Sequence, residues 1–208
     1  MRILRAVLLI AVFAVSARSA TAAPILIDFE TLADFETVTT QFSADGVSFN
    51  GATALQAGAI GGSLNDTDFP PFSGFTVIAD LSGPIQIDFA TGATFFGGHF
   101  TYAAPVTLTA YAGAAVLGTV TSLLSENYSG LQNELLELSV TTAMTHLIIE
   151  GSSFGGSFVL DDVFVETAEQ TDPNPIPEPA TVTLLLSGAA LLGARRRLYA
   201  WRSTRRIA

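Results

Sequence analysis

The chain has no cysteine and no lysine, and its nine basic residues are arginines close to its two ends. The lack of cysteine excludes disulfide bonds, thiol catalysis and cysteine-based zinc sites. Between Pro24 and Ala194 there is neither Lys nor Arg, whereas all 19 acidic residues lie there, so this stretch carries a formal charge of −19. Nucleic acids are bound by cationic side chains that contact phosphates. The composition therefore excludes a nucleic-acid partner, disfavours anionic substrates and leaves cations, neutral sugars and basic molecules.

The N-terminus lacks an apolar run of the roughly 20 residues that a transmembrane helix needs. Residues 1–22 instead have the pattern of a secretory signal peptide. Arg2 and Arg5 form a positive start, and residues 6–15 form a short apolar segment. Small residues then lead to Ala22, which predicts cleavage after that residue. An uncleaved anchor is the alternative.

The C-terminus has a second organised segment. Residues 171–176 form a polar, proline-rich linker that continues neither a strand nor a helix. A Pro-Glu-Pro tripeptide follows, then an uncharged run over 180–194, then an arginine cluster. Fifteen helical residues span about 22 Å, against a hydrocarbon core of about 30 Å, and flanking Arg side chains extend that reach. We therefore predict a sorting or transmembrane segment over 177–198 and a basic tail over 199–208.

The membrane orientation follows from the arginine cluster. By the positive-inside rule this cluster stays cytoplasmic, which places the middle domain outside the inner membrane. The predicted motif consists of Pro177, Glu178, Pro179, Arg195, Arg196 and Arg197.

This arrangement resembles the PEP-CTERM sorting signal of Gram-negative bacteria. The resemblance implies handling by exosortase, a membrane enzyme similar to transpeptidases, and a link to exopolysaccharide. It implies a membrane-anchored precursor that then reaches the cell surface or the extracellular space. The tail beyond Arg197 is longer than the usual short stub of this family. A plain single-pass anchor is the alternative.

The middle of the chain, residues 23–170, reads as an all-β domain. Apolar residues alternate with polar ones in several short stretches, with Gly, Pro, Asn and Asp between them. About ten strands at this spacing predict an antiparallel β-sandwich. The expected strands cover 25–30, 46–50, 74–79, 84–89, 94–102, 105–111, 115–121, 135–140, 146–150 and 157–166.

The domain opens with Ile27-Asp28-Phe29-Glu30 and closes with acidic residues inside the strand over 157–166. This order resembles the jelly rolls of carbohydrate-binding modules in extracellular bacterial proteins. The resemblance implies a jelly-roll-like sandwich and a structural calcium site built by acids of the first and last strands. The implied ligands are Asp28, Glu30, Asp161 and Asp162.

The residues themselves give a physical argument for calcium. Asp28 and Glu30 lie two apart, so on a strand they share a face. Asp161 and Asp162 are adjacent and are expected on opposite faces, with Asp162 on the core side beside Phe164. A buried carboxylate is costly unless it is paired, and the domain has no Lys or Arg to pair with it. Ca²⁺ takes several hard oxygen ligands, and solvated strand ends are the alternative.

Other candidate groups are less specific. Residues 65–68 (Asn-Asp-Thr-Asp) have D-x-D spacing but lack the Gly and distal Glu of an EF-hand loop, so a solvated turn is favoured. His99 and His146 have no metal-ligand spacing, and no G-x-S-x-G nucleophile elbow accompanies them. Aromatic residues that could stack on sugars are Phe69, Phe72, Phe95, Phe96, Tyr102, Tyr111 and Tyr128, although packing in the core or in loops is the simpler interpretation for most of them.

The sequence thus predicts an exported, non-enzymatic protein of the cell surface or extracellular matrix, with a structural or adhesive role linked to exopolysaccharide. Two alternatives stay open. One is a carbohydrate-binding module, which requires exposed aromatic side chains. The other is a carboxylate-dependent polysaccharide hydrolase, which requires two acids facing one cleft about 5–10 Å apart.

Overall fold

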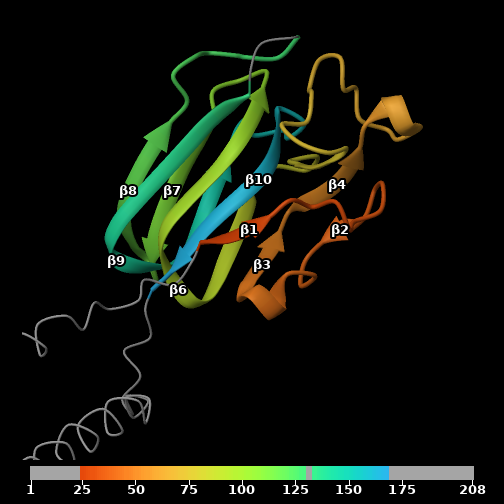
Figure 1. Ribbon diagram of the computed structural model, residues 1–208. Helices are drawn as coiled ribbons and strands as arrows, with labels where there is room; N and C mark the ends of the chain where they lie inside the picture. Colours follow the sequence, from red (N-terminus) through yellow and green to blue (C-terminus); the bar gives the residue numbers. More distant parts are fainter. Residues whose placement is uncertain (1–23, 130–132, 169–208) are drawn as a thin grey trace, which may run out of the picture. The chain divides into compact units, whose positions relative to one another are not determined.

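The computed structural model describes residues 24–129 and 133–168 (Figure 1). All of these belong to one compact unit, Met1–Glu169. The predicted signal peptide, proline-rich linker, sorting segment and basic tail lie outside the described residues. Among the residues that are described, no helix has the length and apolarity to cross a membrane.

The described part of the chain is almost entirely β-structure. Two short 3₁₀ turns, η1 (Ser43–Asp45) and η2 (Gly58–Ile60), interrupt it. The strands are β1 (Ile25–Ile27), β2 (Thr37–Val38), β3 (Val47–Asn50), β4 (Ala52–Gln56), β5 (Thr76–Ala79), β6 (Ile85–Tyr102), β7 (Thr107–Ala112), β8 (Ala115–Thr121), β9 (Glu134–Glu150) and β10 (Phe158–Thr167).

Every strand pair is antiparallel, in the order β2-β4-β5-β10-β6-β9-β7-β8, with β1 beside β10 and β3 beside β6 (Figure 1). Two long strands, β6 and β9, bend and so belong to both layers of the sandwich. The first part of β6 pairs with β3 and with the end of β9, and its second part pairs with β10 and the start of β9. Between Asp88 and Ala93 the register shifts, and Gly92 there has a φ of 77°. A left-handed residue at this point suits glycine and lets the strand bend.

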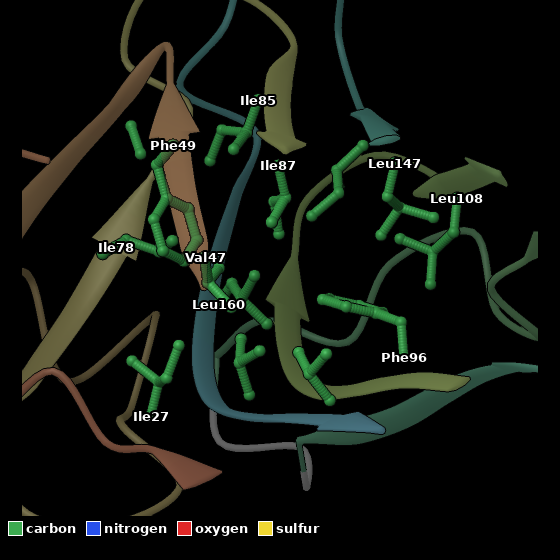
Figure 2. Packing of buried hydrophobic residues seen from close by; sticks show 14 of the residues in the cluster. Ile27, Val47, Phe49, Ile78, Ile85, Ile87, Phe96, Leu108, Leu147 and Leu160 are labelled. Carbon is green, nitrogen blue, oxygen red and sulfur yellow. The ribbon is translucent and has the colours of Figure 1, made fainter. Parts of the chain in front are cut away.

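The hydrophobic core lies between the layers (Figure 2). Ile85 and Ile87 of β6 face it, together with Phe49 of β3 and Leu147 of β9. Because side chains alternate along a strand, one face of each strand fills this core. Each fully buried side chain of this size contributes about 1.5–3 kcal/mol of transfer free energy. A smaller cluster packs on the other side of β5 and consists of Leu55, Leu64, Val77, Ala79 and Val159.

The predicted antiparallel, jelly-roll-like β-sandwich is confirmed. Several details of the prediction were wrong. The stretches 84–89 and 94–102 form a single strand, as do 135–140 and 146–150, because the chain continues as a strand through the register shifts between Asp88 and Ala93 and between Ala93 and Phe95. The short strands β2 and β4 were not predicted, since their small and polar residues give weak alternation.

Candidate functional site

Three carboxylates close around the backbone of residues 72–76, and we call this arrangement the carboxylate clamp. Glu30 Oε1 accepts hydrogen bonds from the backbone N–H groups of Phe75 and Thr76, both at 2.8 Å. Asp161 Oδ2 accepts the N–H groups of Phe72 and Ser73, at 2.8 and 2.9 Å. The third carboxylate, Asp162, accepts the Ser73 hydroxyl through Oδ1 at 3.0 Å. The clamp thus joins the start and end of the domain to a loop in its middle.

A β-bulge in β10 brings Asp161 and Asp162 to the same loop. The register with β6 shifts between Asp161 and Phe164, and Asp162 has a φ of 44°. The Asp162 N–H donates to Asp161 Oδ1 at 2.8 Å. The expectation of opposite faces was wrong because the bulge adds a residue to the strand. After it, Val163 takes the core position, whereas Phe164 lies outside the core cluster.

The two N-terminal acids, Asp28 and Glu30, lie in different surroundings. Strand β1 ends at Ile27, and Phe29 follows with a φ of 60° and its ring fully buried in the core. The two acids therefore do not share the face of a strand, as had been expected. Asp28 is exposed and accepts the Glu30 N–H at 3.3 Å, whereas Glu30 reaches the loop. Of the four predicted residues, three meet in the clamp and Asp28 lies outside it.

Burial makes Asp161 unusual. Its side chain is 1% exposed, and desolvation raises its pKa to about 7, with the charge of Asp162 acting in the same direction. The backbone N–H groups of Ser73, Asp162 and Phe72 lower the pKa and partly offset the burial. Since no Lys or Arg occurs in this part of the chain, backbone N–H groups supply the positive end of the interactions of Glu30 and Asp161, and the Ser73 hydroxyl donates to Asp162.

Calcium remains a prediction. The donor set suits it chemically, since carboxylate and hydroxyl oxygens are the ligands that Ca²⁺ prefers. The inner oxygens of Glu30 and Asp161 already accept N–H groups, which an ion would have to displace or avoid. Within residues 24–129 and 133–168, no group of three or more His, Cys, Asp or Glu side chains is arranged to hold a metal ion.

Asp80 forms a second buried acidic site that the sequence did not single out. It is fully buried and accepts Ser157 N–H and Phe158 N–H at 2.9 and 3.0 Å through Oδ1. Its Oδ2 accepts the Ser157 hydroxyl at 2.9 Å. Burial raises the pKa of Asp80, and these hydrogen bonds lower it less. The site fixes the turn after β5 to the start of β10, so its role is structural.

The acids of the 65–68 loop hold that loop in place. Asp66 accepts the N–H of Ala59 at 3.0 Å. Asp68 accepts the amide of Asn65 at 2.7 Å and the hydroxyl of Ser129 at 2.8 Å. These contacts agree with the favoured interpretation of a turn over that of a metal loop.

The aromatic residues considered for sugar stacking do not form one surface. Phe96 and Tyr102 are fully buried in the core. Phe69 stacks with Tyr128 at 6.1 Å. Elsewhere, Tyr111 stacks with His146 at 4.9 Å, and Phe72 stacks with His99 at 3.4 Å. Only part of the predicted set can therefore contact a common ligand.

Two surface depressions lie away from the clamp. A narrow one of about 140 Å³ is lined mainly by apolar residues, including Leu55, Leu64 and Phe69. A wider one of about 440 Å³ lies between Pro84, Pro105 and Glu150. Asp161, whose pKa would suit a general acid, lines neither depression and is covered by the 72–76 loop.

A model of the PEP-CTERM protein-sorting motif matches residues 175–198. This match covers the tripeptide and the arginine cluster on which the sequence-based resemblance depends. It indicates a secreted protein that is processed at the membrane and exported to the cell surface, and it implies processing by an exosortase. No curated protein matches the sequence.

Several solved structures have a distant likeness to the chain. One is a family 6 carbohydrate-binding module, at 13% identity and a TM-score of 0.38, over 70% of this chain and 95% of that one. Another is CsCBM6-3 from Clostridium stercorarium in complex with cellobiose, at 12% identity and a TM-score of 0.36, over 72% of this chain and 98% of that one. A third is the catalytic domain of a GH87 alpha-1,3-glucanase in complex with tetrasaccharides, at 13% identity and a TM-score of 0.42, over 77% of this chain and 31% of that one. Likenesses this distant assign neither a ligand nor an activity to the chain.

Proposed function

We propose that the chain is a non-enzymatic protein of the cell surface or extracellular matrix, with a structural or adhesive role linked to exopolysaccharide. The observation that carries this proposal is the sorting motif at residues 175–198. The motif accounts for export, and the family resemblance supplies the link to exopolysaccharide. The acidic β-sandwich is the part that remains outside the membrane.

The arrangement of the acids supports a non-catalytic role. A hydrolase of the two-carboxylate type needs one protonated acid and one ionised acid on either side of a bound sugar. Asp161 has a suitable pKa, but its oxygens accept three backbone N–H groups beneath the 72–76 loop. In this position Asp161 stabilises the fold, because a sugar cannot reach its carboxylate unless the 72–76 loop opens.

Carbohydrate binding by the sandwich is the second candidate function. The observation that favours it is Phe72, which is 49% exposed and lies flat on His99, with an interplanar angle of 4°. An exposed aromatic ring held in one orientation can pack against the apolar face of a sugar. Binding of this kind is compatible with a matrix role and needs no catalytic group.

The experiment that tests sorting compares the wild-type chain with a variant carrying Pro177→Ala, Glu178→Ala and Pro179→Ala. We expect the wild type in the outer or extracellular fraction, shortened at its C-terminus, and the variant at full length in the inner membrane. A matched control carries Pro173→Ala and Pro175→Ala in the preceding linker and is expected to be sorted normally. Identical fractionation of the wild type and the tripeptide variant would contradict the proposal.

A further inference from the structure

The outward face of β10, β6 and β9 carries aromatic side chains that the core does not use. Phe96 and Phe100 of β6 point into the core, so Phe95 and His99 point to the opposite face. The register places Phe164 of β10 beside Gly97. Together with Phe72, which comes from the loop, the residues Phe95, His99 and Phe164 define what we call the outer aromatic face.

Three of the rings of this face contact one another. Phe72 stacks flat on His99 at 3.4 Å between ring centroids, and His99 meets Phe164 edge to face at 6.2 Å. Phe95 lies over Gly97, where an added Cβ would be 3.1 Å from Phe95 Cζ. Because Gly97 has no side chain, the Phe95 ring can lie against the sheet.

Apolar side chains extend the face at both edges. Leu26 of β1 pairs with Phe164 and is 57% exposed, and Leu135 of β9 pairs with His99 and is 44% exposed. The face therefore crosses four neighbouring strands, β1, β10, β6 and β9.

Acidic residues surround these rings. Glu137 pairs with Gly97, and Glu166 pairs with Phe95. Asp162 lies close enough for its charge to act on His99. Burial lowers the pKa of His99, although Asp162 and Glu137 raise it, so His99 adds little positive charge at neutral pH. Because residues 24–168 contain no Lys or Arg, the face is aromatic and negatively charged.

We propose that the outer aromatic face binds a polysaccharide that carries free amino groups. The apolar C–H face of a sugar ring packs on an aromatic ring, and a protonated amino group is attracted both by the ring face and by nearby carboxylates. An anionic polysaccharide is repelled, and a neutral one gains only the stacking. The inference rests on the proposed role at the exopolysaccharide and names the chemical class of the sugar.

The test measures binding to the full-length chain in detergent micelles by titration calorimetry at mildly acidic pH, where the amino groups are charged. The probes are hexamers of glucosamine, N-acetylglucosamine and galacturonic acid. We expect the glucosamine hexamer to bind most tightly and its affinity to fall with added salt. Equal affinity for the glucosamine and N-acetylglucosamine hexamers would overturn the proposed preference for amino groups.

Two sets of variants locate the site. Glu137→Gln should weaken binding of the glucosamine hexamer about two- to fivefold, as expected for one charge at an exposed site. Glu150→Gln is the matched control, because it makes the same change at the other end of β9. Phe95→Leu together with Phe164→Leu should weaken binding at least about fivefold, because each change removes the aromatic ring and leaves an apolar side chain. An unchanged melting midpoint shows that each variant is folded.

The outcomes also distinguish this inference from the function on which it rests. If the chain sediments with the native exopolysaccharide but does not bind the glucosamine hexamer, the inference fails and the proposed function stands. Equal effects of Glu137→Gln and Glu150→Gln would also overturn the inference. If the chain does not associate with exopolysaccharide at all, the proposed function fails.

Discussion

Gly74 lies directly against the carboxylate of Glu30, so that a Cβ atom at residue 74 would overlap the carboxylate. Glu30 uses this space to reach the N–H groups of Phe75 and Thr76. The pair shows why the carboxylate clamp needs a glycine: the loop must also turn with a φ of 53° at this residue. A single missing side chain thus allows Glu30 to bind a loop more than 40 residues further along the chain.

Gly74→Ala should therefore destabilise the domain. We expect a loss of about 1–3 kcal/mol beyond that of Gly61→Ala, because the Glu30 side chain must move aside and lose its hydrogen bonds to the N–H groups of Phe75 and Thr76. Gly61 is the matched control, since its φ is 90° and nothing lies within 4 Å of an added Cβ. Chemical denaturation of the two variants measures the difference. Equal losses would show that the contact with Glu30 contributes nothing.

The buried acids predict that the domain loses stability as pH rises. The pKa of Asp161 moves from an ordinary value of 3.8 to about 7 on folding, and that of Asp80 is also raised. For a raised pKa the stabilisation is fully present below about pH 4 and is lost as pH rises towards about 7. The melting midpoint should consequently fall between pH 5 and pH 8. A midpoint that rises steadily over this range would contradict the assignment.

Asp80→Asn should leave the fold intact and reduce the pH dependence. An amide oxygen can accept both N–H groups that Oδ1 accepts, and an amide N–H can donate to the Ser157 hydroxyl. Asp80→Ala should cost about 2–4 kcal/mol, because buried N–H groups lose their acceptor. Thermal melts at acidic and alkaline pH compare the variants. If Asp80→Asn is as damaging as Asp80→Ala, the hydrogen-bond account of this site is wrong.

Calcium binding at the carboxylate clamp is tested by melting the full-length chain in chelator and in millimolar calcium. Relief of the repulsion among its acids should raise the midpoint with calcium concentration, since binding to the native state alone stabilises it. Asp162→Asn should abolish the rise, and Glu150→Gln should not. If calcium does not change the midpoint, the N–H groups and the Ser73 hydroxyl alone offset the burial and the mutual repulsion of the three carboxylates.

The fold could be predicted because the strands alternate so regularly. In the stretch 84–89, for example, Ile85 and Ile87 alternate with polar residues and are both buried in the core. The merging of neighbouring strands into β6 and β9 could not be predicted, because the residues at an irregular bend within a strand resemble a turn in the sequence.

The candidate site was predicted less well than the fold. Acids at the two ends of the domain were expected to meet, and Glu30 and Asp161 do bind the same loop. The loop itself was not foreseen, because its N–H donors carry no sequence signal. The bulge at Asp162 and the burial of Asp80 depend on tertiary packing in the same way, and no local pattern marks either residue.

A role at the exopolysaccharide is tested by the distribution of the chain in a strain that makes the exopolysaccharide and in one that does not. We expect the exported chain to sediment with the polysaccharide matrix in the first strain and to remain soluble in the medium of the second. The same distribution in both strains would contradict a role linked to exopolysaccharide.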